Sequence, residues 1–305
     1  MTQPARPVPS GSSADITRRQ NQPDHLARLR AYSRLYAVAQ RWRRVRVLGT
    51  LILAITGPVL ALSSIDTKGV LGAISAAWLI LGRTVLSRLE QRARSQAVTV
   101  HELYDTELFR LPWNDALAGR RPLPDDVAAA ARRQSDHQRF HTWFTVDLAS
   151  VPWPADVLLC QRQSTVWGRG DHRSYATTVA VLGAICLLTG VAIAVTMGLT
   201  LADYLVKLFL PTAPALLDSI EISRSHRGTS VTRTDDVAAI DDLYEAHRDD
   251  LSAISVNEVR AIQDASFTAR IDTPRVPGWF YKIRRRGTHA DTAAGVDTLR
   301  RSTST

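Results

Sequence analysis

The chain has 305 residues, a formal net charge of +9 and 45% hydrophobic residues, with a mean hydropathy of −0.09. This average is that of a soluble protein, but it hides apolar blocks long enough to cross a membrane, so composition does not exclude a membrane protein. The arginines gather beside these blocks, where anionic headgroups attract basic side chains, so we expect no polymeric nucleic acid as a partner.

The N-terminal residues 1–15, MTQPARPVPSGSSAD, are predicted to form a disordered tail. They are rich in Pro, Ser and Gly and lack the apolar stretch of a cleavable signal. Residues 16–46 are predicted to form an amphipathic cytoplasmic helix, because Pro23 suits a first turn and apolar side chains recur at helical spacing from Leu26 to Trp42. We expect this helix to lie on the membrane or on the cytoplasmic domain.

Residues 47–86 are predicted to form a first transmembrane hairpin. Its first half, 47–65, holds nineteen residues without an ionisable side chain. A helix needs about 20 residues to cross a hydrocarbon core of roughly 30 Å. Its second half, 69–86, is apolar except for Arg83, which lies near the end of the span and can extend its guanidinium to the interface. A kink is expected at Gly57 and Pro58.

Residues 87–174 are predicted to form a cytoplasmic middle segment. It begins as a continuation of the preceding helix, and Pro112, Gly119, Pro122 and Pro124 then interrupt regular structure. A helix is expected over residues 125–140. A loop and a short helix are expected to lead from there into the third span.

Residues 175–220 are predicted to form a second transmembrane hairpin. Residues 174–202 contain no charged side chain, and residues 204–220 carry Lys207 and Asp218 only near their ends. Gly183 and Gly190 lie seven apart on one face of the third span, where close helix packing is favoured.

A stripe of hydroxyl groups on the third span is a candidate pore lining. It consists of Thr178, Thr189, Thr196 and Thr200, which fall within about 60° of one another at 100° per residue. One four-helix protomer lacks the width for an ion path, so we expect a homo-oligomer. The alternative interpretation is that these hydroxyls bond to preceding carbonyls of their own helix.

Residues 221–283 are predicted to form a cytoplasmic helical segment, with one long or two short helices over 235–270. The stretch PRVPGWFY, residues 274–281, is expected to end them, and residues 284–305 are predicted to form a second disordered tail.

Basic residues set the orientation of the predicted spans. The stretch from Arg18 to Arg46 holds nine arginines against one acid, Asp24, whereas neither hairpin turn has a basic excess. We therefore expect an all-α membrane protein. Its four transmembrane helices would form two hairpins, with both termini and a mainly helical domain in the cytoplasm.

Four stretches, in this order around the two hairpins, carry a family resemblance. They are QNQPDHLARLRAYSRLYAVAQR at 20–41, YDTELFRLPWN at 104–114, ADVLLCQRQSTVW at 155–167 and VRAIQDASFTARIDTPRVPGWFY at 259–281. Together they resemble the SMODS-associated four-transmembrane family, which is described as pore-forming effectors of bacterial defence. The resemblance covers about residues 16–281. The chain departs from the family at Gly168, where the family tends to have an acidic residue.

The resemblance implies an effector of the bacterial inner membrane, encoded beside a nucleotidyltransferase that makes a nucleotide messenger during phage infection. A cyclic oligonucleotide or related nucleotide would trigger the protein, which would open a pore or disrupt the membrane and kill the host. A competing interpretation is a non-conducting membrane adaptor or sensor that acts through its soluble helices. A small transporter is a third, although no span carries a charged residue at its middle.

Candidate ligand-binding residues lie mostly on one predicted helical stripe. Arginine forms bidentate hydrogen bonds to phosphate, amide and acidic groups can pair with base edges, and aromatic rings can stack on bases. The candidates are Arg260, Gln263, Asp264, Arg270, Trp279, Trp113, Asn114, Gln161 and Arg162. The alternative interpretation is structural: Arg260 and Asp264 are spaced as an ordinary ion pair, and the tryptophans are core residues.

No catalytic residue, cofactor or metal site is predicted. His137 and His141 have the spacing of a zinc pair on a helix, but no Glu follows His137 and no third ligand is evident. Cys160 has no neighbouring histidine in sequence to act as a base. Cys160 and Cys186 fall in a cytoplasmic segment and in a span, so we expect no disulfide.

Overall fold

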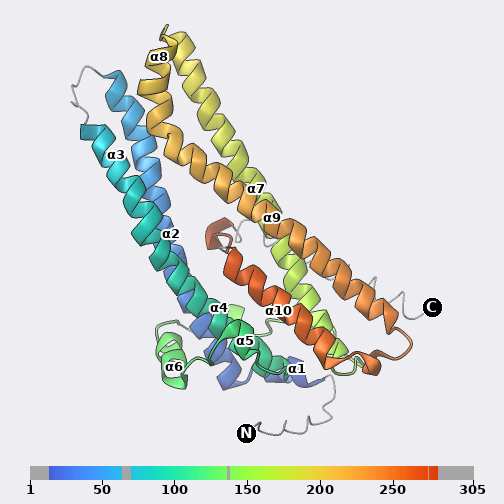
Figure 1. Cartoon of the computed structure of the whole chain (residues 1–305). Coiled ribbons are helices and arrows are strands. Elements are labelled where there is room, and N and C mark those ends of the chain that lie inside the picture. The colour runs from blue at the N-terminus through green and yellow to red at the C-terminus, as the bar shows by residue number, and fades with distance from the viewer. Residues whose placement is uncertain (1–13, 64–69, 136–137, 274, 281–305) are drawn as a thin grey trace.

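A computed structural model describes residues 14–63, 70–135, 138–273 and 275–280 (Figure 1). Every regular element in this part of the chain is a helix, which agrees with the predicted all-α class. The predicted turn at residues 66–69, most of both predicted tails and His137 lie outside the described residues.

The elements follow one another as four long helical rods with short helices between them. The first rod is α2 (Pro23–Leu62), preceded by α1 (Ala14–Arg19). The second comprises α3 (Val70–Leu81), a π-helical turn (Gly82–Leu86) and α4 (Ser87–Phe109). The short helices α5 (Asp115–Ala118) and α6 (Pro124–Arg132) and a 3₁₀ turn (Gln138–Phe140) follow.

The second half of the chain repeats this arrangement. The third rod is α7 (Ala155–Thr196). The fourth comprises α8 (Leu201–Tyr204), a π-helical turn (Leu205–Phe209) and α9 (Leu210–Ala246). A 3₁₀ turn (Leu251–Ala253) and α10 (Val256–Asp272) complete the described elements. Figure 1 shows α2 with α3 and α4 on one side, α7 with α8 and α9 on the other, and α10 between the two pairs.

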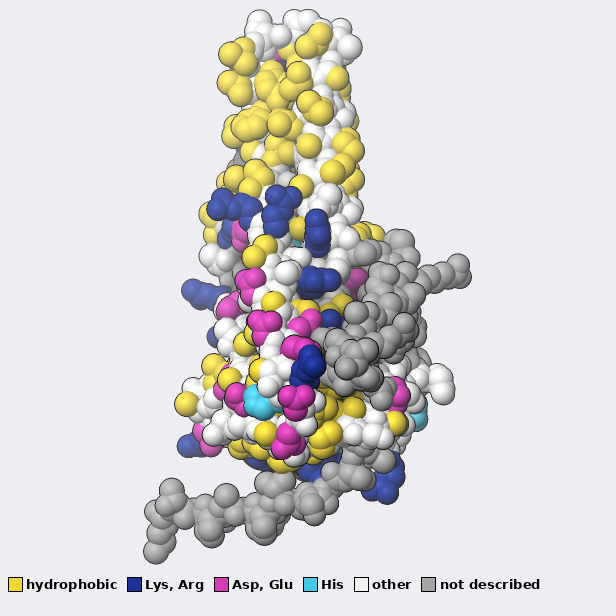
Figure 2. All heavy atoms as spheres, turned by 90° about the vertical axis from the view of Figure 1, so that its right-hand side faces the viewer, with side chains coloured by type: hydrophobic (Ala, Val, Ile, Leu, Met, Phe, Trp, Pro, Cys, Tyr) yellow, Lys and Arg dark blue, Asp and Glu magenta, His cyan; other side chains and the backbone are white. Residues whose placement is uncertain are grey.

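The rods share one apolar end. Two helices, Pro23–Leu62 and Ala155–Thr196, are long and apolar enough to cross a membrane, with hydropathies of 2.0 and 2.5 over their most apolar stretches. Only 11% and 6% of those stretches are buried, which distinguishes them from the core helices of a soluble protein. Large apolar side chains such as Leu188 and Val195 are exposed there. Figure 2 shows this apolar surface at one end of the molecule, with arginine and lysine side chains immediately below it.

The second and fourth predicted spans have a different structure from the first and third. Each is interrupted by a π-helical turn, so α3 with 12 residues and α8 with 4 are short as single helices. Their π turns continue into α4 and α9 without a break in the helical backbone. Close approaches join the rods: a Cβ on Gly183 would lie 2.3 Å from the Ser219 hydroxyl, as its predicted packing role requires.

At the other end the rods enclose the core of the soluble part. This core contains side chains from α2, α4, α7, α9 and α10, including Leu29, Tyr32, Val98, Tyr104, Leu108, Leu158, Leu159, Ile240 and Val259. The ring of Tyr32 stacks on that of His101 with centroids 4.1 Å apart. The soluble part therefore contains a packed core of its own, built on extensions of the apolar rods.

Three predicted elements have different limits in the structure. The helix expected over residues 125–140 ends at Arg132, and only a 3₁₀ turn follows. A loop and a short helix were expected before the third span, but α7 begins at Ala155 and runs unbroken through Gly168 and Gly170 into that span. The missing side chain at Gly168 leaves room for an arginine of α9, which packs against the helix at this position. The predicted kink site, Gly57–Pro58, lies within the continuous helix α2, where Gly57 approaches Pro211.

Candidate functional site

Helix α10 positions most of the predicted ligand-binding residues. Ser255 and Glu258 form a capping box at its start: the Ser255 hydroxyl accepts from the Asn257 amide, and Glu258 accepts from the Ser255 amide at 2.9 Å. This start gives a register in which Val259, Gln263 and Phe267 are buried. Side chains on this buried face point toward α4 and α7.

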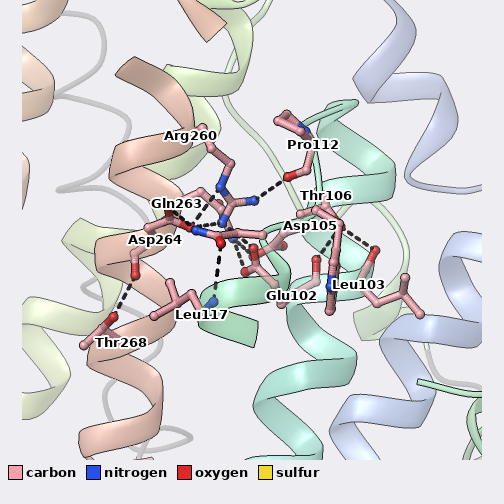
Figure 3. A network of polar contacts seen from close by, with 12 residues as sticks. Glu102, Leu103, Asp105, Thr106, Pro112, Leu117, Arg260, Gln263, Asp264 and Thr268 are labelled. Carbon is pink, nitrogen blue, oxygen red and sulfur yellow. Dashed lines mark hydrogen bonds and ion pairs between the residues drawn. The ribbon is translucent and has the colours of Figure 1, made fainter. Parts of the chain in front are cut away.

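The buried face of α10 forms a polar network with α4 (Figure 3). Arg260 donates to Glu102 at 2.5 Å, to Asp264 at 2.6 and 3.0 Å and to the Pro112 carbonyl at 3.1 Å. Gln263 donates to Glu102 at 2.8 Å and to Asp105 at 3.0 Å. We call this set, with Asn114, Gln161 and Arg270, the α10 network.

The remaining members of the α10 network attach other elements to it. Arg270 donates to Asp105 at 2.7 Å, and Asn114 donates to Asp264 at 2.9 Å while its own oxygen caps α5. Gln161 of α7 donates to Gln263 at 3.1 Å. Burial, followed by the charge of Asp105, raises the pKa of Glu102. The positive charge of Arg260 acts to lower the same pKa. Both arginines of the α10 network thus have carboxylate partners, and the predicted Arg260–Asp264 ion pair is present.

The other three predicted ligand-binding residues lie apart from the α10 network. Arg162 is buried and pairs with both carboxylate oxygens of Asp241 at 2.5 and 2.9 Å. The Trp113 indole donates to the Gly119 carbonyl at 2.8 Å. Trp279 is 56% exposed. The structure therefore brings together Arg260, Gln263, Asp264, Asn114, Gln161 and Arg270, and separates them from these three.

The four threonines of the third rod differ in their contacts. Thr178 and Thr196 donate to carbonyl oxygens of their own helix, at 2.9 and 3.0 Å, and Thr200 caps α8. Thr189 is exposed on the apolar surface. The alternative interpretation of intrahelical bonding thus holds for two of the four hydroxyls in the single chain.

A cavity of about 280 Å³ lies beside the C-terminal half of α10 and includes residues from all four rods. Tyr36 belongs to α2, His101 to α4, Gly168 to α7 and Arg233 to α9. Arg270 of α10 also lines it and is the one predicted ligand-binding residue that does so. We call it the rod cavity.

Three arginines give the rod cavity a positive charge. They are Arg233, Arg270 and Arg275, and one carboxylate, Asp171, lines the same space. Burial, followed by Arg270, lowers the pKa of Arg233 to about 10, so its side chain remains protonated at neutral pH. Arg275 lies over the Tyr36 ring, 4.5 Å from its centroid.

The histidines of the rod cavity are neutral. Burial, followed by the charge of Arg270, lowers the pKa of His101 well below its ordinary value. Burial, followed by Arg233, lowers the pKa of His172 to about 2. Because both rings are uncharged at physiological pH, the positive charge of the cavity comes from the arginines.

Sequence patterns had not singled out Arg233 or Arg275. Arg233 follows the apolar block of the fourth rod by more than three helical turns, and nothing in VTRTDD marks it as unpaired. The one available signal was Gly168, noted as a departure from the resembled family. In the structure that glycine faces Arg233: a Cβ at residue 168 would lie 2.5 Å from a guanidinium nitrogen.

The boundary between the apolar end and the soluble part carries a further charged group, which we call the boundary cluster. Arg46 of α2 lies 3.5 Å from Glu90 of α4 and 3.7 Å from Asp218 of α9. Arg83, in the first π turn, lies 3.2 Å from Asp218 and 2.7 Å from Glu221. These ion pairs join the two halves of the molecule below its apolar surface. Among the described residues, no group of three His, Cys, Asp or Glu side chains could hold a metal ion.

Comparisons with known proteins agree with this architecture. The model of the SMODS-associating 4TM effector domain matches residues 14–299. A probable CBASS effector molecule of Bacillus cereus is 22% identical over 278 residues, which cover 88% of this chain and 92% of the relative. No solved structure matches. Because the family model spans nearly the whole chain, from α1 past the last described residue, the protein belongs to the SMODS-associating 4TM effector family.

Proposed function

We propose that the protein is a membrane effector of a nucleotide-triggered anti-phage system, with four transmembrane helices in two hairpins. In this proposal, a nucleotide signal binds the soluble part in the cytoplasm and rearranges the spans, which permeabilise the inner membrane. Membership of an effector family and the exposed apolar end support this role.

The observation that carries the proposal is the continuity of the rods. Each boundary between a predicted span and the soluble part falls within a continuous run of helix: 46/47 in α2, 86/87 at the junction with α4, 174/175 in α7 and 220/221 in α9. A helix transmits displacement along its axis because its backbone hydrogen bonds are internal. A change in the soluble part therefore acts directly on the membrane segments.

The helical segments that follow α2 and α7 support four spans rather than two, because each runs back along the preceding apolar helix. The ends of α2 and α7 lie beside the starts of α3 and α8 at the apolar end (Figure 1), and α3 and the π turn before α9 expose Ile80 and Val206. Polar backbone in lipid must be satisfied internally, and helical hairpins achieve this. The arginine belt below the apolar surface supports a cytoplasmic location for the soluble part and both termini.

Permeation in this proposal requires an oligomer, because one four-helix protomer lacks the width for an ion path. Thr189 and Thr196 are exposed on α7, where neighbouring copies would bring hydroxyl groups to a shared axis. The boundary cluster would hold the resting arrangement, since Arg46 and Arg83 both contact Asp218 across the two hairpins. For a ligand to change this equilibrium, its contacts must differ between the two arrangements.

A bacterial depolarisation assay tests the proposal. Cells expressing the protein would be given a panel of cyclic di- and trinucleotides through co-expressed synthases, and a voltage-sensitive dye would report membrane potential. We expect depolarisation with at least one nucleotide and none with an inactive synthase. Correct membrane insertion without depolarisation under any nucleotide would favour the non-conducting adaptor or sensor instead. Reporter fusions at the two termini test the orientation independently.

A further inference from the structure

We propose that the rod cavity binds a phosphodiester group of a nucleotide together with one adjoining base, and that Arg233 is the principal phosphate-binding side chain. This inference rests on the proposed function for its physiological ligand. It is tested by direct binding, so that its failure can be told from a failure of membrane permeation.

Arg233 has the geometry of an anion-binding group without its anion. Its Nε atom is buried and has no hydrogen-bond partner among the residues that the structure describes. The charge of Asp236, about one turn further along α9, acts to raise the pKa of Arg233, but no ion pair of 4.0 Å or less joins the two side chains in the described part. A buried donor without an acceptor is costly, and a bound phosphate would satisfy it.

Gly168 is what places this guanidinium in the cavity. A Cβ at residue 168 would lie 2.5 Å from Nη1, 2.6 Å from Cζ and 2.9 Å from Nε of Arg233, closer than real Cβ atoms approach. Any larger residue would therefore displace the guanidinium. An aspartate would also supply the missing carboxylate and neutralise the charge.

The other arginines of the rod cavity complement Arg233. Arg270 uses one nitrogen for Asp105, at 2.7 Å, and Arg275 is held over Tyr36 by its ring contact rather than by a carboxylate. Arg162 and Arg260, by contrast, are each bound by carboxylates at 3.0 Å or less. Phosphate oxygens accept readily from guanidinium groups, which matches a cavity with three guanidiniums and one lining carboxylate, Asp171.

The lining of the rod cavity also contains two indole rings. Trp143 and Trp167 both line the cavity and meet edge to face, with ring centroids 6.3 Å apart. Bases stack favourably on indole rings in single-stranded nucleic-acid sites. The volume of about 280 Å³ is just below the usual range for small-molecule pockets. It therefore suits one phosphate and one base, with the rest of a cyclic oligonucleotide outside.

The position of the cavity explains how occupancy would reach the membrane. Its lining includes Tyr36, His101, Gly168 and Arg233, one from each rod, so one ligand contacts all four rods at once. A phosphate that draws Arg233 toward Arg275 would change the spacing between α9 and α2. The contacts of the ligand would then differ between the resting and the rearranged state, as a ligand-driven shift between two states requires.

Binding of a panel of cyclic di- and trinucleotides to the full-length protein in detergent micelles tests the inference. Microscale thermophoresis would measure affinity, and tryptophan fluorescence would report stacking. We expect Arg233→Ala and Gly168→Asp each to weaken binding about tenfold to a hundredfold. The first removes the charged donor, and the second displaces it and pairs it with a carboxylate. Arg227→Ala, on the exposed side of the same helix, is the matched control and should leave affinity unchanged.

The outcomes separate cleanly. Equal affinity of wild type and Arg233→Ala, both shown folded by circular dichroism, would overturn the inference and leave the proposed function standing. Failure of every panel member to bind the folded wild type would also overturn it, while the depolarisation assay would decide the proposed function separately. A lipid headgroup supplies the same phosphodiester chemistry. Co-purified phosphatidylglycerol that is retained by the wild type, lost from Arg233→Ala and not displaced by nucleotide would overturn the nucleotide assignment.

Discussion

The α10 network and the rod cavity lie against the same helix and share Arg270, yet their charges are balanced differently. In the α10 network, Arg260 contacts two carboxylates and Gln263 contacts two more carboxylate oxygens. In the rod cavity, the Arg233 Nε is buried with no acceptor among the described residues. Both regions combine arginine, amide and aromatic groups, so composition does not distinguish them.

The difference shows where to look for a ligand in a helical membrane protein. A matched set of charges stabilises the packing of helices and has no remaining donor for a ligand. An unmatched buried arginine retains its donor and is stable only if the fold compensates or a ligand arrives. Six of the predicted ligand-binding residues belong to the α10 network: Arg260, Gln263, Asp264, Asn114, Gln161 and Arg270.

The largest expected loss of stability comes from breaking the α10 network. Glu102→Ala leaves Arg260 and Gln263 buried without a shared acceptor, and we expect a loss of about 3 kcal/mol in unfolding free energy. Glu102→Gln keeps the shape and one acceptor and should cost less. Unfolding of the detergent-solubilised protein, followed by far-UV circular dichroism, measures both. Equal stability of wild type and Glu102→Ala would contradict the assignment of a structural role.

A buried carboxylate outside the network sharpens the comparison through pH. Burial raises the pKa of Asp156 to about 7, with Arg110 and the Val157 amide acting against the shift. Because the folded state binds this proton more tightly than the unfolded chain does, the stability contributed by protonation is lost as the pH rises from about 4 to about 7.

Asp156→Asn should therefore stabilise the protein above pH 7, by at most about 4 kcal/mol, and have little effect near pH 4. Asparagine keeps an oxygen that can accept from the Val157 amide, a bond of 2.7 Å in the structure. Thermal unfolding at a series of pH values checks the prediction. A variant that loses stability equally at all pH values would show that the carboxylate is needed for packing rather than titrating as described.

The rod cavity should respond in the opposite way from the α10 network. Arg233→Ala removes a group with no hydrogen bond among the described residues, so we expect unfolding free energy to stay within about 0.5 kcal/mol of wild type. Nucleotide-triggered depolarisation should require about tenfold to a hundredfold more nucleotide. If stability fell as far as in Glu102→Ala, the contrast between the two regions would fail.

The edge of the α10 network should show a smaller effect. Asn114→Ala removes the N-cap of α5 and the bond to Asp264, and we expect a loss of about 1 kcal/mol. Asn114→Asp would keep the cap but place a second carboxylate beside Asp264, so it should be less stable than wild type. Chemical denaturation distinguishes the two contributions.

A small stability effect is also expected at the boundary cluster. Arg83 is 43% exposed, and exposed ion pairs contribute about 0–1 kcal/mol, so Arg83→Gln should barely alter unfolding. If its contacts with Asp218 and Glu221 hold the resting arrangement, the variant should still raise basal dye leakage from liposomes slightly. Identical leakage from wild type and variant would remove this role.

Much of the helical architecture could be predicted from hydropathy. The predicted spans 47–65 and 174–202 overlap, over residues 47–62 and 174–196, with the two helices that are long and apolar enough to cross a membrane. Pro23 begins α2 as predicted, because proline fits the first turn of a helix. The continuity between the spans and the soluble helices was harder to predict, because Gly168 and Gly170 resemble a loop signal. In the structure Gly168 instead lies within α7 and packs against Arg233, a contact that the sequence does not reveal.

The candidate site was predictable only in its types of residue. The stripe on α10 exists, and helical spacing correctly placed Arg260 beside Asp264. Whether an arginine meets a carboxylate from another helix depends on tertiary packing: Glu102 and Asp105 lie more than 150 residues from their α10 partners in sequence. Arg233 could not be recognised for the same reason, because the lack of an acceptor is a property of its three-dimensional surroundings.

The two π-helical turns, at Gly82–Leu86 and Leu205–Phe209, affect how surfaces on the returning rods must be assigned. A π turn holds one residue more than an α turn, which advances the angular phase of all later residues by about 100°. A single helical wheel drawn from residue 70 to residue 109 therefore misplaces the residues after the π turn by about 100°. Core-facing residues of α4 would then be assigned to the wrong side of the rod. Cysteine-accessibility scans of these rods should be indexed separately above and below each π turn.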